Sequence, residues 1–448
     1  MSLILGLEPS EIEEKEKREK FTISIIGCRK AGIQFAVAFA DAGFRVICND
    51  DDQNLLQLLI KGKTPYFTRE IESKIKSNIK RGRIRTESDI KTAVSQSQIV
   101  ILTTFIKINI RNKLNFSKIE RNCKKIGKVL NRGMLIIYAN ISGIGYIEKT
   151  IKSILEDTSG FRASEDFGLV YCPIQLNDKN PNIFTEKDLM IAGTDKESLN
   201  AAEIVLKTIM KKEIKKITDF KILEAAILFA IANNDLKLAF ANEMAIFSEK
   251  LGLDYFEIIK IIEEKNTFFS QNIGIEEGEK SKFYMLLESA DNNAANAKLC
   301  ILARKINEGL GRYLIKLTQQ SLRTCGKTLR RTKISIIGSF QPRSTVSELI
   351  KLIEKKGAKI NFYDPFLPKI YLQDYQKLFK RTFNEAVEGV DCLIILHHHP
   401  KIKRINFKKL SARMKMPAAI IDFSGILEPK KAEKAGFIFS GLGREAKK

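Results

Sequence analysis

Hydrophobic residues in the first half of the chain alternate between short β-branched runs and longer amphipathic stretches. A helical pattern covers Ala31–Ala42, and another begins at Asp52. Five runs predict strands, namely Ile23–Ile26, Arg45–Asn49, Gln98–Thr103, Met134–Tyr138 and Gly168–Tyr171. Because strands separated by helices form parallel sheets with right-handed crossovers, we expect a doubly wound α/β domain over residues 21–212.

The period changes to 3.6 residues from about Asp219. Ile222–Leu251 is largely apolar, so it predicts a long central helix that packs on several sides or forms a homodimer. A second helical pattern, from Ala290 to Leu322, predicts a connector. Residues 213–325 are therefore expected to form a central helical dimerisation segment.

The alternation of strands and helices resumes in residues 326–448, where the last predicted strands are Ala418–Asp422 and Phe437–Gly441. Residues 1–20 are rich in charge and predict a helical extension. The expected fold is α/β, with two Rossmann-like domains joined by the central helical segment.

The same five residues, Ile-Ser-Ile-Ile-Gly, occur at Ile23–Gly27 and at Ile334–Gly338. Each copy is followed by a helical pattern and then, after a second β-rich run, by an acid, Asp50 or Asp364. This is the opening β-turn-α-β unit of a nucleotide-binding sheet, and its repetition predicts two nucleotide sites.

The first turn runs from Gly27 through Cys28, Arg29, Lys30 and Ala31 to Gly32. Gly27 suits the tight turn and Gly32 suits close packing of helix on strand, but Arg29 replaces the middle glycine. Its side chain either crowds a pyrophosphate or offers it a cation. The sequence of this turn is therefore compatible both with NAD binding and with a turn that has lost its cofactor. Asp50 would accept hydrogen bonds from an adenosine ribose and repel a 2′-phosphate, which favours NAD over NADP.

The formal charge of +23 is the most unusual feature of the composition. Basic residues are spread along the chain without interleaved aromatic residues, so a solvated lysine-rich surface is favoured over a nucleic-acid partner. The apolar runs are too short for a membrane span. Seven cysteines without a C-x-x-C pair indicate reduced thiols in a cytoplasm. The run His397–His399 predicts a surface loop, because adjacent residues cannot converge on one metal ion.

Several blocks, in order, resemble the UDP-glucose/GDP-mannose dehydrogenase family over about residues 21–445. These blocks are Ile25–Ala40, Gly43–Asp50, Ala239–Glu243, Glu249–Asp254, Gly357–Pro365, Glu385–Asp391 and Gly436–Arg444. The resemblance implies NAD-dependent oxidation of a nucleotide-sugar C6 alcohol to a carboxylate, through a cysteine thiohemiacetal and thioester. The first domain would bind NAD and the last would bind the nucleoside diphosphate of a UDP- or GDP-sugar.

The resemblance also implies binding residues. Thr103 occupies the family's turn after the fourth strand, so it is a cofactor-binding candidate together with Gly27, Cys28, Arg29, Lys30, Gly32 and Asp50. Four residues in matching segments are candidates for the substrate nucleotide, namely Asn242, Phe340, Asp364 and Arg444.

The catalytic positions depart from the family. The segment Asn272–Lys280, where the family has its cysteine, contains none, so the covalent route has no nucleophile. The family's lysine, asparagine and glutamate positions are Ile227, Ile231 and Ile174, which cannot stabilise an oxyanion or orient water. No catalytic residue is therefore assigned.

We expect a divergent family member with impaired or no dehydrogenase activity, which keeps nucleotide binding or serves as a non-catalytic partner. One alternative is a different NAD-linked reaction that needs no cysteine, and another is a basic scaffold for an acidic polymer. Cys28 and Cys172 are candidates for a nucleophile at a position other than the family's cysteine. The start of a helix lowers the pKa of a thiol, which favours Cys28.

Overall fold

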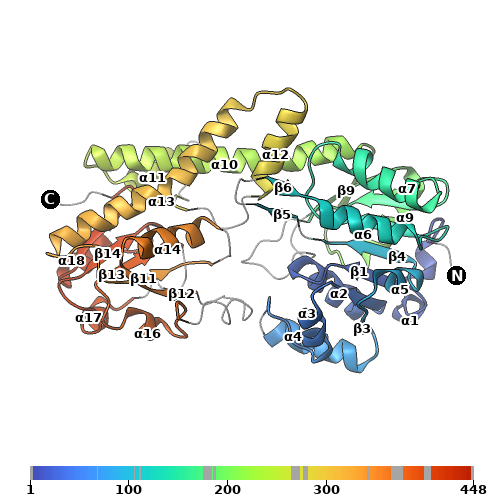
Figure 1. Ribbon diagram of the computed structural model, residues 1–448, viewed down its shortest axis with the longest axis horizontal. Helices are drawn as coiled ribbons and strands as arrows, with labels where there is room; N and C mark the ends of the chain where they lie inside the picture. The colour runs from blue at the N-terminus through green and yellow to red at the C-terminus, as the bar shows by residue number, and fades with distance from the viewer. Residues whose placement is uncertain are drawn as a thin grey trace. The chain divides into compact units, whose positions relative to one another are not determined.

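The computed structural model of the chain shows two compact units (Figure 1). One comprises residues 1–230 with 281–293, and the other comprises residues 231–280 with 294–448. The described residues are 4–67, 69–104, 106–109, 113–174, 184, 188–263, 273–275, 281–340, 344–364, 377–397 and 405–444. The predicted central segment, residues 213–325, is shared between the two units, and its boundaries stay a prediction.

An eight-stranded sheet forms the first unit, with the order β10-β9-β8-β7-β4-β1-β2-β3. Its strands are β1 (Thr22–Ile26), β2 (Arg45–Asn49), β3 (Ile84–Thr86), β4 (Ile99–Leu102), β7 (Leu135–Tyr138), β8 (Gly168–Tyr171), β9 (Leu189–Gly193) and β10 (Ile214–Ile217). All neighbouring pairs are parallel except β8 with β9. Strands β4, β7 and β8 are buried throughout, as expected for a sheet covered on both faces.

Helices pack on this sheet and a small hairpin lies beside it (Figure 1). The helices are η1 (Pro9–Glu11), α1 (Lys15–Arg18), α2 (Lys30–Ala42), α3 (Gln53–Ile60), α4 (Arg69–Lys80), α5 (Ile90–Ser95), α6 (Ser117–Gly127), η2 (Ile147–Lys152), α7 (Ser153–Ser159), α9 (Lys196–Lys207), α12 (Ser281–Asn292) and the start of α10 (Phe220–Lys250). The hairpin pairs β5 (Lys107–Ile108) with β6 (Leu114–Asn115).

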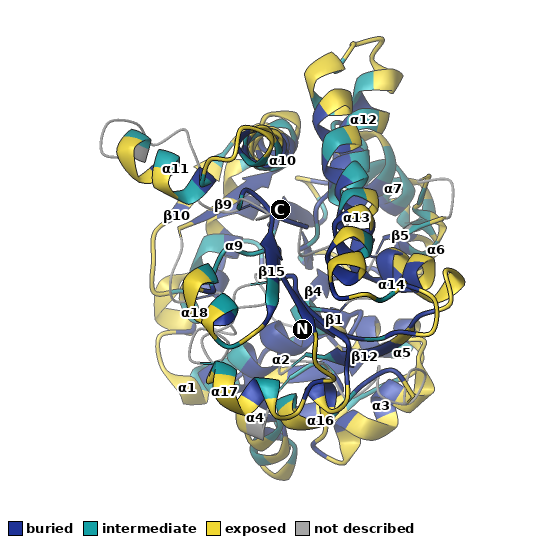
Figure 2. Cartoon of the chain, turned by 90° about the vertical axis from the view of Figure 1, so that its left-hand side faces the viewer, coloured by how far each residue is buried: buried dark blue, intermediate teal, exposed yellow. Residues whose placement is uncertain are grey.

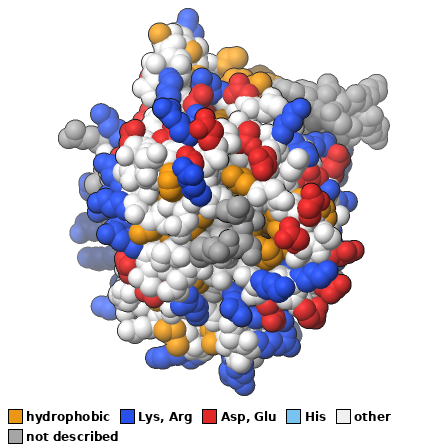
Figure 3. All heavy atoms as spheres, turned by 90° about the vertical axis from the view of Figure 1, so that its right-hand side faces the viewer, with side chains coloured by type: hydrophobic (Ala, Val, Ile, Leu, Met, Phe, Trp, Pro, Cys, Tyr) orange, Lys and Arg blue, Asp and Glu red, His pale blue; other side chains and the backbone are white. Residues whose placement is uncertain are grey.

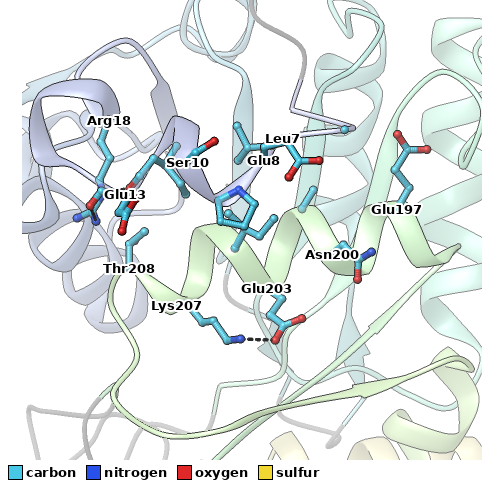
Figure 4. Close-up of a pocket in the computed structure, with 15 residues that line it drawn as sticks. Leu7, Glu8, Ser10, Glu13, Arg18, Glu197, Asn200, Glu203, Lys207 and Thr208 are labelled. Atoms are coloured by element: carbon cyan, nitrogen blue, oxygen red, sulfur yellow. Dashed lines mark hydrogen bonds and ion pairs between the residues drawn. The ribbon is translucent and has the colours of Figure 1, made fainter.

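The N-terminal segment differs from the predicted helical extension, because its only α-helix among the described residues is the four-residue α1. Ile4, Leu7 and Ile12 are buried in the core of the first unit, and their burial directs the path of this segment in place of a longer helix. A hollow of about 760 Å³ lies between this segment and α9 (Figure 4). It is lined by charged side chains such as Glu203, and none of its lining residues comes from the glycine turn.

A five-stranded parallel sheet, ordered β12-β11-β13-β14-β15, forms the second unit. Its strands are β11 (Lys333–Ile337), β12 (Lys359–Tyr363), β13 (Cys392–Ile395), β14 (Ala419–Asp422) and β15 (Ile438–Gly441). Its helices are the rest of α10, α11 (Tyr255–Glu263), α13 (Lys298–Thr324), α14 (Thr345–Lys355), α16 (Phe383–Val387), α17 (Phe407–Ser411) and α18 (Pro429–Lys434). Figure 2 shows its strands buried and the outer faces of α16, α17 and α18 exposed.

The fold class is confirmed: two Rossmann-like sheets and the long helix α10 are present. The single connector helix predicted over Ala290–Leu322 is wrong, because α12 ends at Asn292 and α13 begins at Lys298. Ala294 lies between them with a left-handed φ of 52°, which an α-helix cannot accommodate. Among the described residues, no helix combines the length and apolarity needed to cross a membrane.

Candidate functional site

The turn after β1 has the close backbone packing of a dinucleotide-binding loop. Gly27 has a φ of 107°, which favours glycine, and its N–H donates to the carbonyl of Asn49 at the end of β2, 2.8 Å away. A Cβ on Gly32 would lie 2.0 Å from Gly27 O, so only glycine allows α2 to start this close to the strand. Thr103 closes the turn from the end of β4, because its Oγ1 donates to Gly27 O at 2.5 Å.

Asp50 holds the same turn from the end of β2. Its Oδ2 accepts from the N–H of Cys28 at 2.8 Å, and its Oδ1 accepts from the N–H of Asp52 at 3.1 Å. Burial raises the pKa of this carboxyl group and a hydrogen bond with Asp51 adds to the rise, while the charge of Lys118 opposes it. Asp50 is thus a structural part of the turn, and its contact with a ribose stays a prediction.

The predicted cofactor residues come together at the carboxyl ends of β1, β2 and β4. Arg29 precedes α2 and is exposed, and Lys30 is the first residue of that helix and is half-buried. The start of an α-helix attracts phosphate through its free N–H groups and its dipole, and two basic side chains add to that attraction. The turn, the helix start and the acid at the end of β2 therefore fit the pyrophosphate and ribose of a dinucleotide.

Neither Cys28 nor Cys172 has the surroundings of a nucleophile. The Cys28 thiol is fully buried and donates to the carbonyl of Asn49 at 3.4 Å, which directs it into the sheet and away from the loop surface. Burial raises the pKa of Cys28 well above its usual value and raises that of Cys172 to about 12. Both remain thiols at neutral pH, so the structure gives no support to the displaced-nucleophile hypothesis.

The second unit repeats the turn after β11. The N–H of Phe340 donates to Asp364 Oδ2 at 3.0 Å, as that of Cys28 does to Asp50. The Phe340 ring itself lies in a buried aromatic cluster, 5.0 Å between centroids from Phe379, so only its backbone faces the turn. Asp364 is therefore placed as the sequence predicts, whereas the Phe340 side chain belongs to the core.

His397 also belongs to this second turn. Its Nδ1 accepts from the N–H of Ser339 at 3.0 Å, so the ring proton sits on Nε2, which donates to the carbonyl of Ile275 at 3.0 Å. His397 is half-buried, and the other two histidines of the predicted loop lie outside the described residues. The described part of the chain holds no cluster of metal-ligating side chains.

Asn242 is fully buried and binds protein groups. Its Oδ1 accepts from the N–H of Gly274 at 2.7 Å, and its Nδ2 donates to the carbonyl of Gly274 and to Asn307 Oδ1. Residues 273–275 are the described part of the segment in which the family has its cysteine. Ile273 and Ile275 are buried in the core of the second unit, so this stretch is anchored as structure.

Arg444, the last candidate for the substrate nucleotide, is engaged within the second unit. Its guanidinium forms an ion pair with Asp254 and lies over the ring of Phe256, 4.4 Å from the centroid. It also donates to the carbonyl of Gly425, in the turn that follows β14. Its side chain remains 15% exposed, which leaves little of it for a ligand.

Isoleucine occupies three positions at which the family has catalytic residues, and each of these isoleucines lies in apolar surroundings. Ile227 is buried on α10, Ile231 is half-buried one turn later, and Ile174 packs on the core of the first unit. At the buried position Ile227 a lysine would place a charge in apolar surroundings, which is costly. The structure thus offers no general base or oxyanion donor at these three places.

Two side chains that shape these loops, Glu224 and Lys118, are not predicted by the sequence patterns. Glu224 on α10 is fully buried and accepts from Ser142 Oγ and the Ile147 N–H, both at 3.0 Å, and from the Gly145 N–H, so it anchors the loop that leads into η2. The sequence feature that could have indicated Glu224 is its position as a single acid within the apolar first turns of α10. Lys118 on α6 reaches the acids at the end of β2, and only the fold brings it there.

Comparisons with known proteins agree with this architecture. Three models of the UDP-glucose/GDP-mannose dehydrogenase family match the chain: the NAD binding domain over residues 21–211, the central domain over residues 223–309 and the UDP binding domain over residues 343–429. The UDP-N-acetyl-D-mannosamine dehydrogenase of Pyrococcus horikoshii is 23% identical, and the match covers 94% of this chain and 99% of that one. The UDP-glucose 6-dehydrogenase of Rhizobium meliloti is 22% identical over the same shares of the two chains.

Solved structures show the same fold. The structure of the Pyrococcus horikoshii UDP-D-ManNAc dehydrogenase superposes with a TM-score of 0.81 at 22% identity, covering 95% of this chain and all of that one. A UDP-glucose dehydrogenase from Pyrobaculum islandicum gives a TM-score of 0.79 at 17% identity, covering 95% and 98%. At these identities the likeness establishes architecture and leaves the chemistry to be argued from the residues.

Proposed function

Because the chain belongs to the UDP-glucose/GDP-mannose dehydrogenase family, we propose that it keeps the family's nucleotide-binding architecture without its cysteine-dependent oxidation. It would bind NAD at the turn after β1 and a nucleotide or nucleotide-sugar at the turn after β11. The observation that carries the proposal is a contrast. In both turns the first glycine and the acid after the second strand make backbone hydrogen bonds. By contrast, isoleucine stands at positions 227 and 231, where the family has catalytic side chains.

The state of the cysteines supports the proposal. All seven lie among the described residues, where none forms a disulfide, and six are buried. Cys300 is partly exposed, but burial raises its pKa as well, so it is no activated thiolate. A covalent thioester route needs a reactive thiolate, and the chain supplies none. The free thiols also support a cytoplasmic location.

The binding half of the proposal is tested with Arg29. Arg29 is exposed and immediately precedes α2, and we propose that it acts as a cation for the pyrophosphate and not as an obstacle. Replacing Arg29 by glycine should then weaken NAD binding about tenfold, as expected for one charged contact. Isothermal titration of the full chain measures this. Tighter binding by R29G would show that the side chain blocks the site.

We also propose a homodimer formed through α10. Exposed apolar side chains occur along and just after this helix, among them Ile222, Phe229, Phe240, Phe247 and Leu251. Their spacings of 7, 11, 7 and 4 residues return to one helix face, and Phe229 is 61% exposed. An apolar stripe of this length is typical of an interface. Changing Phe229 and Phe247 to serine should yield a monomer in sedimentation analysis, and an unchanged dimer would contradict this assignment.

A basic scaffold for an acidic polymer is less well supported. On the face of the molecule drawn in Figure 3, basic and acidic side chains are interspersed. A polyanion site needs a continuous basic surface, and its binding falls steeply with salt. A titration with heparin at rising salt would distinguish this function from nucleotide binding.

A further inference from the structure

A lysine side chain reaches the acids at the end of β2, where an adenosine ribose would bind. Lys118, in the first turn of α6, has its Nζ 2.5 Å from Asp51 Oδ1 and 3.9 Å from Asp50 Oδ1. The Lys118 side chain is 23% exposed, so its ammonium group can meet a ligand. The end of β2 therefore combines two carboxylates with one ammonium group, which offsets one of the two negative charges and offers an anion a cationic partner.

The two acids have different roles. Asp50 is buried and accepts hydrogen bonds from the backbone of Cys28 and Asp52, so it is committed to the shape of the turn. The side chain of Asp51 is 70% exposed, and it holds the ammonium group of Lys118 in place. An exposed ion pair of this kind contributes little to stability and can exchange its anion readily.

We propose that Lys118 is a specificity-determining residue, which lets this corner bind an adenine dinucleotide with a 2′-phosphate as well as one with a free 2′-hydroxyl. The inference rests on the proposed NAD site. In the 2′-phosphate complex the phosphate replaces the Asp51 carboxylate as the partner of Lys118, and the exposed Asp51 side chain turns to solvent, which takes over its solvation. With a free 2′-hydroxyl, the Lys118–Asp51 pair stays and the ribose meets Asp50. A lone acid in this position would repel the phosphate.

The test compares the dissociation constants of NAD and NADP for the full chain by isothermal titration, in wild type and in Lys118→Met. Lys124→Met is the matched control, because it removes the same charge from an exposed position of the same helix. Loss of one charged contact should weaken NADP about tenfold, while NAD changes less than about threefold. The control should leave the ratio of the two constants unchanged, and Lys118→Arg, which keeps the charge, should stay close to wild type.

The outcomes separate the two claims. A ratio that stays the same in K118M, or a wild type that binds NAD but not NADP, overturns the role of Lys118 and leaves the NAD site standing. If neither dinucleotide binds to wild type or K118M, the proposed function fails and the inference fails with it. If the ratio of the NAD and NADP dissociation constants changes equally in K118M and K124M, the effect is long-range attraction to a basic protein. That outcome also overturns the specific role of Lys118.

Discussion

Gly32→Ala probes how closely the nucleotide turn is packed. A Cβ at this position would lie 2.0 Å from Gly27 O and 3.0 Å from Thr103 Oγ1. Relieving the first contact requires the Gly27 peptide to move by about 1 Å or more, since carbon and oxygen rarely approach within about 3 Å. That movement strains the hydrogen bonds that Gly27 makes with Asn49 and Thr103.

The free energy follows from opposing effects. Overpacking costs about 1–3 kcal/mol and strained hydrogen bonds cost about 1 kcal/mol, whereas alanine in a helix gains about 1 kcal/mol over glycine. We therefore expect G32A to lose about 2 kcal/mol of unfolding free energy. Urea unfolding followed by circular dichroism measures the loss, and titration with NAD should show weakened binding in the same variant.

Gly309→Ala is the matched control, because Gly309 lies within α13 and a Cβ there would meet no atom within 4 Å. The same change should stabilise the protein at this site, by up to about 1 kcal/mol. If G32A proves as stable as wild type, or responds as G309A does, the packing argument for the turn is refuted.

Two further predictions concern buried groups. Burial raises the pKa of Glu224, so its contribution to stability is present below the ordinary glutamate pKa of about 4.3 and is lost as pH rises through the folded value. Wild type should therefore lose unfolding free energy, relative to Glu224→Gln, as pH rises from the ordinary glutamate pKa through the folded value. A difference between the two proteins that does not depend on pH would contradict the raised pKa of Glu224. In native protein a thiol reagent should label Cys300 first, since the other six cysteines are buried; rapid labelling of Cys28 would refute the inward thiol.

Local sequence patterns predict the parts of the fold whose geometry depends on neighbouring residues. The strand run Ile23–Ile26, the glycines at 27 and 32 and the acid at 50 predicted the first turn because each is a local requirement of that geometry. The break between α12 and α13 was not predicted, because it depends on the left-handed backbone conformation of one residue, Ala294. A 3.6-residue hydrophobic period does not reveal such a conformation.

The candidate site was predicted less completely, for a physical reason. Lys118 and Glu224 act on residues far away in the chain, and only tertiary packing brings them to Asp51 and to the loop at Ser142. Asn242 and Phe340 matched family positions, yet their side chains are used for internal packing. A residue type at a family position therefore shows where a site lies more reliably than what the side chain does there.

We propose that this chain keeps the family's nucleotide turns and has lost its oxidation chemistry. The most direct test incubates the full chain with NAD and UDP-glucose, UDP-N-acetylmannosamine or GDP-mannose, and follows NADH formation, with the Pyrococcus horikoshii relative assayed in parallel. We predict no NADH above the protein-free control with any of the three sugars, under conditions in which the relative turns over its own. Sustained NADH formation by this chain with any of them would contradict the account.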